Sequence, residues 1–301
     1  MSTNVLITSR DLDIFAMISR LRFLTLNQIA ALFYDKHDGY NLEMRKAYWA
    51  LAKRAATLVR AGFLTTADIS FFDRGNRRAY LLGKNAIDAL KDIREEEDFE
   101  SPGWLQRKHT AAVWHGPHHV LVANFLINLI LLSKLRDDFA VDDWLADRDC
   151  RYYIKKGDQV KILDPDLYLC VQNGSPDPIP MLIELDRGTV SSTVIRRKAH
   201  RVFEYYATDK HKLDIGFPYF PRVLVITPDR ERRDKFAREI NNAKEHYKGK
   251  YEKNISAFPF WLTTYDDVDI NSIDRGRVTS KPLEPVWISS DGELGLSPFV
   301  G

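Results

Sequence analysis

Cysteine is scarce in this sequence. Only Cys150 and Cys170 occur among the 301 residues, and they do not form a CxxC pair. Two thiols this far apart in the chain indicate neither a disulfide framework nor a thiolate zinc site. We therefore expect a protein of the reducing cytoplasm.

Hydrophobic segments of membrane-spanning length are also missing. The longest apolar run, from Val120 to Leu132, is interrupted by Asn124 and Asn128, and it is shorter than the ~20 residues that cross a bilayer. The N-terminus lacks a basic segment followed by an apolar stretch and a cleavage site, so no signal peptide is expected. The run predicts a buried helix, and we expect no membrane contact.

The motifs of several enzyme classes are absent. The sequence has no Gly-rich phosphate loop, Ser-His-Asp arrangement or reactive-cysteine pattern. A histidine group precedes the apolar run, but no acidic or thiolate ligand accompanies it at metal-ligand spacing. Its members are His109, His115, His118 and His119. Because Gly116-Pro117 predicts a loop before a helix start, we expect His118 or His119 to pack or hydrogen-bond there rather than to bind zinc.

The composition is that of a soluble protein with two domains. Hydrophobic residues make up 45% of the chain, charged residues make up 29%, and the formal net charge is +2. An acidic segment that ends in Ser101-Pro102-Gly103 marks the expected boundary. We predict a first domain at 1–94, a linker at 95–104, a second domain at 105–269 and an irregular C-terminal tail at 270–301.

The first domain has the pattern of a winged helix-turn-helix. Helical periodicity predicts helices near 8–20, 25–33 and 43–61. Thr25 and Gln28 have the spacing of a capping box, and Gly62 can take the left-handed conformation that ends a helix. Two strand-like runs, 63–72 and 77–82, follow and are joined by a turn at Asp73-Arg74-Gly75-Asn76.

Basic residues of this domain fall where a winged helix contacts DNA. Lys46, Lys53 and Arg60 are seven residues apart and form one line on the third predicted helix, which can follow phosphates or enter the major groove. The hairpin adds arginines at its tip. The DNA-binding candidates of this domain are Arg45, Lys46, Lys53, Arg60, Arg74, Arg77 and Arg78. The alternative is a domain that contacts other proteins and carries these charges in solvent.

The second domain is predicted to be a sheet with helices packed on it, an α+β or α/β fold. A buried helix at 118–136 comes first. Strands at 150–155, 160–171 and 180–186 follow, then a helix at 191–207, a strand at 221–227, a helix at 230–247 and a strand near 258–264.

Carboxylates lie on two of these predicted strands. Glu184 and Asp186 are two residues apart on one predicted strand, so they point from the same face, and Asp166 lies on the preceding predicted strand. If the strands are neighbours, the three carboxylates converge and need a cation such as Mg²⁺ or Mn²⁺. Such a metal can activate water and stabilise a phosphate under attack.

Basic side chains on the next predicted helix complete this candidate site. Lys198 lies about 60° from the centre of the helix face that is expected to be buried, so it can reach the sheet edge and stabilise the phosphate. Arg187, Arg196, Arg197 and Arg201 lie further out, where they can hold a DNA backbone. The alternative is that the carboxylates cap loops and pair with these arginines.

At these residues the chain resembles the PD-(D/E)xK nuclease superfamily. Asp164-Pro165-Asp166 and Glu184-Leu185-Asp186 look like its motif, except that Asp186 stands where the superfamily has lysine and Lys198 is the only replacement. The resemblance implies a restriction-endonuclease-like core of helix, three strands, helix and strand. It also implies Asp166, Glu184, Asp186 and Lys198 as catalytic residues, with the three carboxylates on the metal.

Over residues 8 to 240 the chain resembles the replication-relaxation family of plasmid and mobile-element proteins. The winged helix, the histidine-rich segment, Asp-Pro-Asp and Glu-Leu-Asp-Arg-Gly-Thr carry this resemblance. It implies a role in plasmid replication or transfer and does not settle an activity. Together with the nuclease resemblance, it leads to the hypothesis of a DNA-binding protein whose second domain cleaves or nicks DNA with Mg²⁺ or Mn²⁺. The alternative is a non-catalytic replication accessory protein or transcriptional regulator. Double-stranded DNA, a second copy of the chain and plasmid replication or transfer proteins are the candidate partners.

Overall fold

The structure is a computed structural model that describes residues 5–34, 37–38, 41–42, 44–71, 75–94, 102–156, 159–247, 258, 260–293 and 297–300. These residues form the mixed α+β fold that the sequence predicts. They divide into unit 1, Met1–Leu131 with Asn271–Val278, and unit 2, Leu132–Ile270 with Thr279–Gly301. Of the linker expected at 95–104, residues 95–101 lie outside the described part, and residues 102–104 begin a helix.

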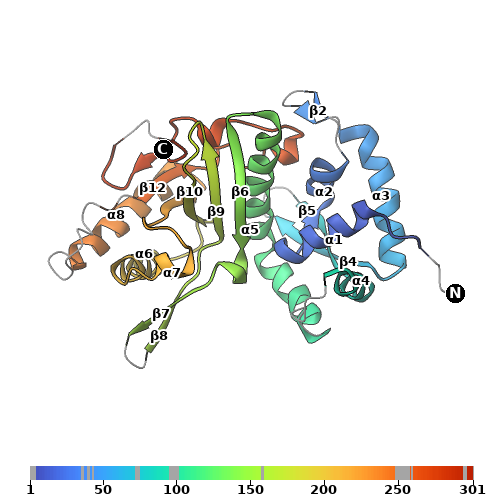
Figure 1. Ribbon diagram of the computed structural model, residues 1–301, viewed down its shortest axis with the longest axis horizontal. Coiled ribbons are helices and arrows are strands. Elements are labelled where there is room, and N and C mark those ends of the chain that lie inside the picture. Colours follow the sequence, from blue (N-terminus) through green and yellow to red (C-terminus); the bar gives the residue numbers. More distant parts are fainter. Residues whose placement is uncertain are drawn as a thin grey trace. The chain divides into compact units, whose positions relative to one another are not determined.

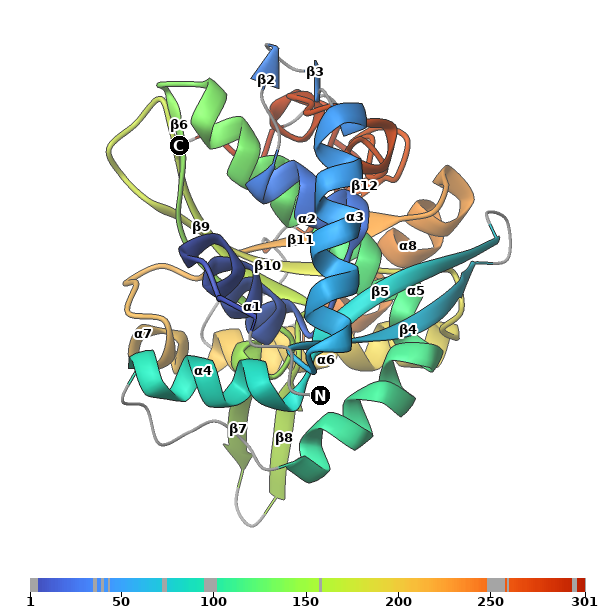
Figure 2. The ribbon, with the colours of Figure 1, turned by 90° about the vertical axis from the view of Figure 1, so that its right-hand side faces the viewer.

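Unit 1 begins with helices that pack beside a small antiparallel sheet of order β1-β5-β4. Its helices are α1 (Ser9–Leu21), α2 (Leu26–Phe33), α3 (Met44–Arg60) and α4 (Lys84–Arg94). Its strands are β1 (Leu24–Thr25), β2 (His37–Asp38), β3 (Asn41–Leu42), β4 (Leu64–Phe71) and β5 (Gly75–Leu82). Helix α3 contacts α2 and β4 (Figure 2). The three helices and the hairpin that the sequence predicts for this part of the chain are present.

Local sequence signals explain where these helices begin and end. The capping box predicted at Thr25 and Gln28 is present, and Thr8 with Asp11 forms a second one at α1. Gly62 follows α3 with a φ of +74°, a conformation that costs a glycine little. The apolar side of α3, with Leu51, Ala55 and Leu58, is buried.

Helix α5 (Pro102–Leu135) is longer than predicted. The predicted loop at Gly116-Pro117 is wrong, because the helix continues through both residues. A Cβ at Gly116 would lie 2.6 Å from Cγ2 of Ile69 on β4, so glycine allows the helix to approach the hairpin closely. The segment His115–Leu135 has the length and composition of a membrane span, but 67% of the apolar window is buried inside the structure, which is typical of a core helix.

Unit 2 contains a six-stranded sheet of order β13-β12-β11-β10-β9-β6. Its strands are β6 (Phe139–Ala146), β9 (Leu167–Asn173), β10 (Ile179–Leu185), β11 (Arg222–Thr227), β12 (Phe260–Thr264) and β13 (Ile288–Ser289). Strands β6, β9 and β10 pair antiparallel, and β11 runs parallel to β10 after a crossover helix. The sheet is therefore mixed, with helices α6 (Ser192–Ala207) and α8 (Arg230–Tyr247) in the second half of the unit.

The structure corrects the strands predicted for this unit. The run predicted at 160–171 divides into β9 and a strand at 159–163 that lies in a different sheet. The first strand of the sheet is β6, whose pairing with β9 shifts register between Val141 and Asp143 and which the sequence analysis missed. The run predicted at 150–155 is instead β7 (Tyr152–Lys156), which pairs with β8 (Gln159–Leu163) in a separate hairpin. Figure 1 shows this hairpin projecting away from the sheet.

Helices α6 (Ser192–Ala207) and α8 (Arg230–Tyr247) pack on each other, and α8 packs on β11 and β12. Val202, Phe203 and Phe236 lie in the core that they share with the sheet. The remaining elements are η1 (Asp147–Cys150), α7 (His211–Asp214), η3 (Ile273–Arg275) and η4 (Lys281–Leu283). Cys150 and Cys170 are both buried free thiols.

Candidate functional site

One face of α3 is exposed and basic. Trp49, Lys53, Ala56 and Arg60 follow one another at intervals of four, three and four residues, so they share a helix face. All are exposed, and the Trp49 side chain is 81% exposed. We call these residues the α3 face. The sequence analysis missed Trp49, although its spacing from Lys53 places it on the predicted basic line.

Arg54, next to Lys53, forms an ion pair within unit 1 instead. Its guanidinium donates to both carboxylate oxygens of Asp11, at 3.1 Å and 2.5 Å, and Asp11 is only 1% exposed. Burial alone would raise the pKa of Asp11, but hydrogen bonds from Arg54 and Thr8 outweigh it and lower that pKa below its ordinary value. Arg54 therefore joins α3 to α1.

Arg77 on β5 is also paired within unit 1. It lies 2.5 Å from Oδ2 of Asp274, which accepts a hydrogen bond from Asn124 Nδ2 at 2.9 Å. Asn124 Oδ1 in turn accepts from Nε2 of Gln28 at 2.8 Å. This chain of polar contacts ties β5, α5, α2 and the segment 271–278 together. We therefore leave Arg77 out of the DNA surface proposed below.

The other DNA-binding candidates of unit 1 divide into two groups. Arg78 is 64% exposed and lies 3.7 Å from Asp68 on the neighbouring strand, a spacing at which an exposed pair contributes little. The side chains of Arg45 and Lys46, and the whole of Arg74, lie outside the described residues.

In unit 2 the sheet brings Asp166 and Glu184 together. The register of β9 and β10 pairs Leu167 with Ile183, so Asp166 and Glu184 stand opposite each other one step further on. Asp166 N–H donates to the Ile183 carbonyl at 2.9 Å, and the Leu185 N–H donates to Asp166 Oδ2 at 2.7 Å. These hydrogen bonds fix the backbone on which the two carboxylates are carried.

Lys198 of α6 reaches back to these carboxylates, as its helical position predicts. Its Nζ donates to Oε1 of Glu184. Burial would lower the pKa of Lys198, but the charges of Glu184, Asp166 and Asp186 raise it above the ordinary value. The lysine is thus held protonated beside the two carboxylates.

Asp186 has a different neighbour. Arg232 of α8 donates from Nε to Oδ2 at 2.5 Å and from Nη2 to Oδ1 at 3.0 Å, and the Asp186 side chain is 2% exposed. Oδ2 also accepts from the Gly188 N–H at 2.8 Å. Asp186 is therefore the centre of a buried ion pair that the sequence analysis did not foresee.

A metal held by three carboxylates does not fit this arrangement. Both oxygens of Asp186 are engaged by Arg232, and the described residues contain no group of three His, Cys, Asp or Glu side chains that could hold a metal. Asp166 and Glu184 are the pair that fits, because Mg²⁺ is often bound by one or two carboxylates together with water and substrate phosphate.

The outer arginines lie on and near α6. Arg197 is exposed and Arg201 is half-buried, and both line a groove over the outer side of that helix. Arg196 lines the same groove and pairs with Glu239 at 2.6 Å. Arg187 is half-buried in the loop after β10.

Comparison with known proteins identifies the family. The family model described as replication-relaxation matches residues 15–218, more than half of the 301 residues. The match covers α2, α3, the β4–β5 hairpin, Asp166, Glu184 and all of α6. Searches of curated proteins and of solved structures found no match. The chain belongs to the replication-relaxation family.

Proposed function

We propose that the protein binds duplex DNA through the α3 face during replication of a plasmid or other mobile element. The observation that carries this proposal is the contrast between neighbouring cations of unit 1. Arg54 and Arg77 are paired with Asp11 and Asp274, whereas Lys53 and Arg60 project from α3 into solvent beside Trp49.

The physical chemistry of this face suits a duplex. Exposed cations on one helix line contact phosphates and release counterions, which drives binding of any sequence. A helix that follows a helix and precedes a β-hairpin is the element that enters the major groove in winged helices. The broad indole of Trp49 then gives an apolar contact next to the phosphates. We expect the family role in plasmid replication to be exerted on DNA in this way, in the cytoplasm.

The test is duplex binding by fluorescence anisotropy. Lys53→Glu/Arg60→Glu should weaken binding about 30-fold, because two phosphate contacts become repulsive. A matched control, Lys134→Glu/Lys212→Glu, makes the same change in net charge at exposed positions on α5 and α7 and should leave the affinity within about twofold. Equal effects of both variants, or no DNA binding by the unaltered protein, would reject the proposal in favour of a protein-binding adaptor.

A second candidate function is metal-dependent cleavage of DNA, favoured by the meeting of Asp166, Glu184 and Lys198. Asp166 and Glu184 would hold Mg²⁺ or Mn²⁺, which when bound supplies an activated water and neutralises phosphate charge. Lys198, held protonated by its acidic neighbours, donates to a phosphate oxygen. The Asp186–Arg232 pair keeps the end of β10 fixed on α8.

Supercoiled plasmid with Mg²⁺ or Mn²⁺ tests this candidate. Cleavage predicts nicked or linear product that is lost with EDTA, with Asp166→Asn and with Glu184→Gln. Asp164→Asn is the matched control, because Asp164 stands on the other side of Pro165 and pairs with Arg151 at 3.1 Å. Plasmid that is shifted on a gel but stays intact would leave the DNA-binding proposal standing and reject cleavage.

A further inference from the structure

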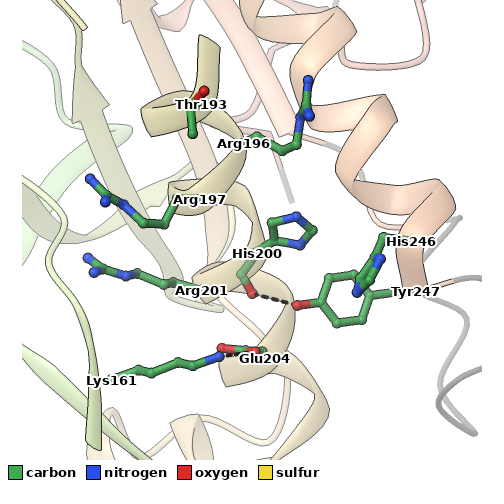
Figure 3. A pocket seen from close by; sticks show the side chains of 9 residues that line it. All are labelled: Lys161, Thr193, Arg196, Arg197, His200, Arg201, Glu204, His246 and Tyr247. Atoms are coloured by element: carbon green, nitrogen blue, oxygen red, sulfur yellow. Dashed lines mark hydrogen bonds and ion pairs between the residues drawn. The ribbon is translucent and has the colours of Figure 1, made fainter. Parts of the chain in front are cut away.

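A groove in unit 2 follows the outer side of α6. It has a volume of about 530 Å³ and is bounded by β8 on one side and by the end of α8 on the other (Figure 3). Thr193, Arg197, His200 and Glu204 of α6 form its floor, at helical spacings that place them on one face. This volume is in the range of pockets that hold a small ligand, and it suits one nucleotide unit of a longer chain.

The cations of the groove are not all neutralised. Lys161 of β8 pairs with Glu204 at 2.5 Å, and Arg196 pairs with Glu239 at 2.6 Å. Arg197 and Arg201 have no acidic partner within the part of the chain that the structure describes. They are four residues apart, and Figure 3 shows both guanidinium groups extending to the same side of α6. Like charges at this spacing repel each other, so an anion between them is favourable.

Aromatic rings line the other side of the groove. The His200 and His246 rings meet at 5.2 Å in an edge-to-face arrangement, and Tyr247 fixes the helix behind them by donating to the His200 carbonyl at 3.4 Å. His246 is exposed, and Nδ1 of His200 is a buried polar atom without a hydrogen-bond partner among the residues that the structure describes. A planar ring with hydrogen-bonding groups at its edges, such as a nucleobase, can pack against these imidazole rings.

The β7–β8 hairpin contributes Lys161 to the groove. Tyr153 is 49% exposed and Val160 is 56% exposed, and Lys155 between them in sequence is also exposed. Lys161 is paired with the buried Ile154, so Tyr153, Lys155 and Val160 share the other face of the hairpin and lie outside the groove. Figure 1 shows the hairpin leaving the sheet beside α6.

We propose that the α6 groove binds single-stranded DNA, with Arg197 and Arg201 on its phosphates and an unpaired base against His200 and His246. Cations on one side of a groove and rings on the other suit a single strand, because only unpaired bases expose their faces. The choice of DNA as the ligand of this groove rests on the function proposed above. A protein that holds duplex on the α3 face and a single strand in the α6 groove can act where replication opens a duplex.

The test compares oligo(dT) with a duplex of equal length by fluorescence anisotropy of the full chain. Arg197→Glu/Arg201→Glu should weaken oligo(dT) binding about 100-fold and duplex binding no more than about twofold. His246→Ala, which removes the ring and leaves every arginine and lysine in place, should weaken oligo(dT) binding about tenfold. Lys134→Glu/Lys212→Glu is again the charge control, and Arg197→Gln/Arg201→Gln serves if the reversal lowers the melting temperature.

Unchanged oligo(dT) binding in both arginine variants would overturn the inference, as would an equal loss in the charge control. Inorganic phosphate is compared with chloride as a competitor at equal ionic strength. If phosphate displaces oligo(dT) more effectively and His246→Ala has no effect, the groove binds phosphate groups alone and the inference of a single-strand site is rejected. The Lys53→Glu/Arg60→Glu protein separates the two proposals, since it should lose duplex affinity and keep oligo(dT) affinity.

Discussion

Arg232 neutralises a carboxylate that is almost wholly removed from water. Its exposed fraction is 9% and that of Asp186 is 2%, and the two form a bidentate pair. Removing one partner of a buried pair leaves an uncompensated charge, which typically costs about 3–5 kcal/mol. Arg232→Ala should therefore lower the free energy of unfolding by about that amount, measured by urea denaturation.

The control for this prediction removes both charges. Asp186→Asn/Arg232→Gln should recover part of the loss, because neutral partners leave no buried charge behind. A loss below about 1 kcal/mol in Arg232→Ala would show that Asp186 is not dependent on this partner, and would return Asp186 to the set of candidate metal ligands.

Single residues also show which parts of the site could be predicted from the sequence. Asp166, Glu184 and Lys198 were found because strand alternation and helical spacing act over short distances. Arg232 lies 46 residues beyond Asp186 on a helix with many charges, and only the packing of α8 beside the end of β10 brings the two together. Periodicity carries no signal for such a pair.

Among the elements, α5 depends on the close approach of its Gly116 to Ile69 of β4. Gly116 lies where a Cβ would come within 2.6 Å of Ile69 Cγ2 and 2.9 Å of Cγ1, and Ile69 is fully buried. Gly116→Ala gains about 1 kcal/mol in helix propensity but loses about 1–3 kcal/mol by overpacking. We predict a net fall of about 1 kcal/mol in the free energy of unfolding.

The sign of this effect should depend on Ile69. In an Ile69→Ala background the added methyl group has room, so Gly116→Ala should become stabilising by up to about 1 kcal/mol. A double-mutant cycle measured by urea denaturation checks this. Destabilisation of the same size in both backgrounds would mean that the glycine is needed for another reason.

Elements with local signals were predicted well. The capping box at Thr25, the glycine after α3 and the amphipathic helices α6 and α8 are determined by neighbours in sequence, and the structure has them. Strand β6 was missed because Asp142 and Asp143 interrupt its apolar alternation at the register shift. The loop at Gly116-Pro117 was wrong because tertiary packing on β4 overrides the local preference of both residues.

At the scale of the whole molecule, the chain presents two basic surfaces of different chemistry, one in each unit. The α3 face has cations around an exposed indole, and the α6 groove has cations beside imidazole rings. The net charge of only +2 gave no sign of either surface, because 42 acidic residues nearly balance 44 basic ones and the sum does not say where each charge lies. Which arginines are paired could be learned only from the fold.

The salt dependence of duplex affinity tests the central proposal most directly. If the α3 face contacts phosphates, the logarithm of the binding constant should fall steeply and linearly with the logarithm of salt concentration. Lys53→Glu/Arg60→Glu should make this slope shallower by about 2, since each phosphate contact contributes about 0.9. A slope that is the same in both proteins, or an affinity that does not change with salt, would contradict duplex binding by the α3 face.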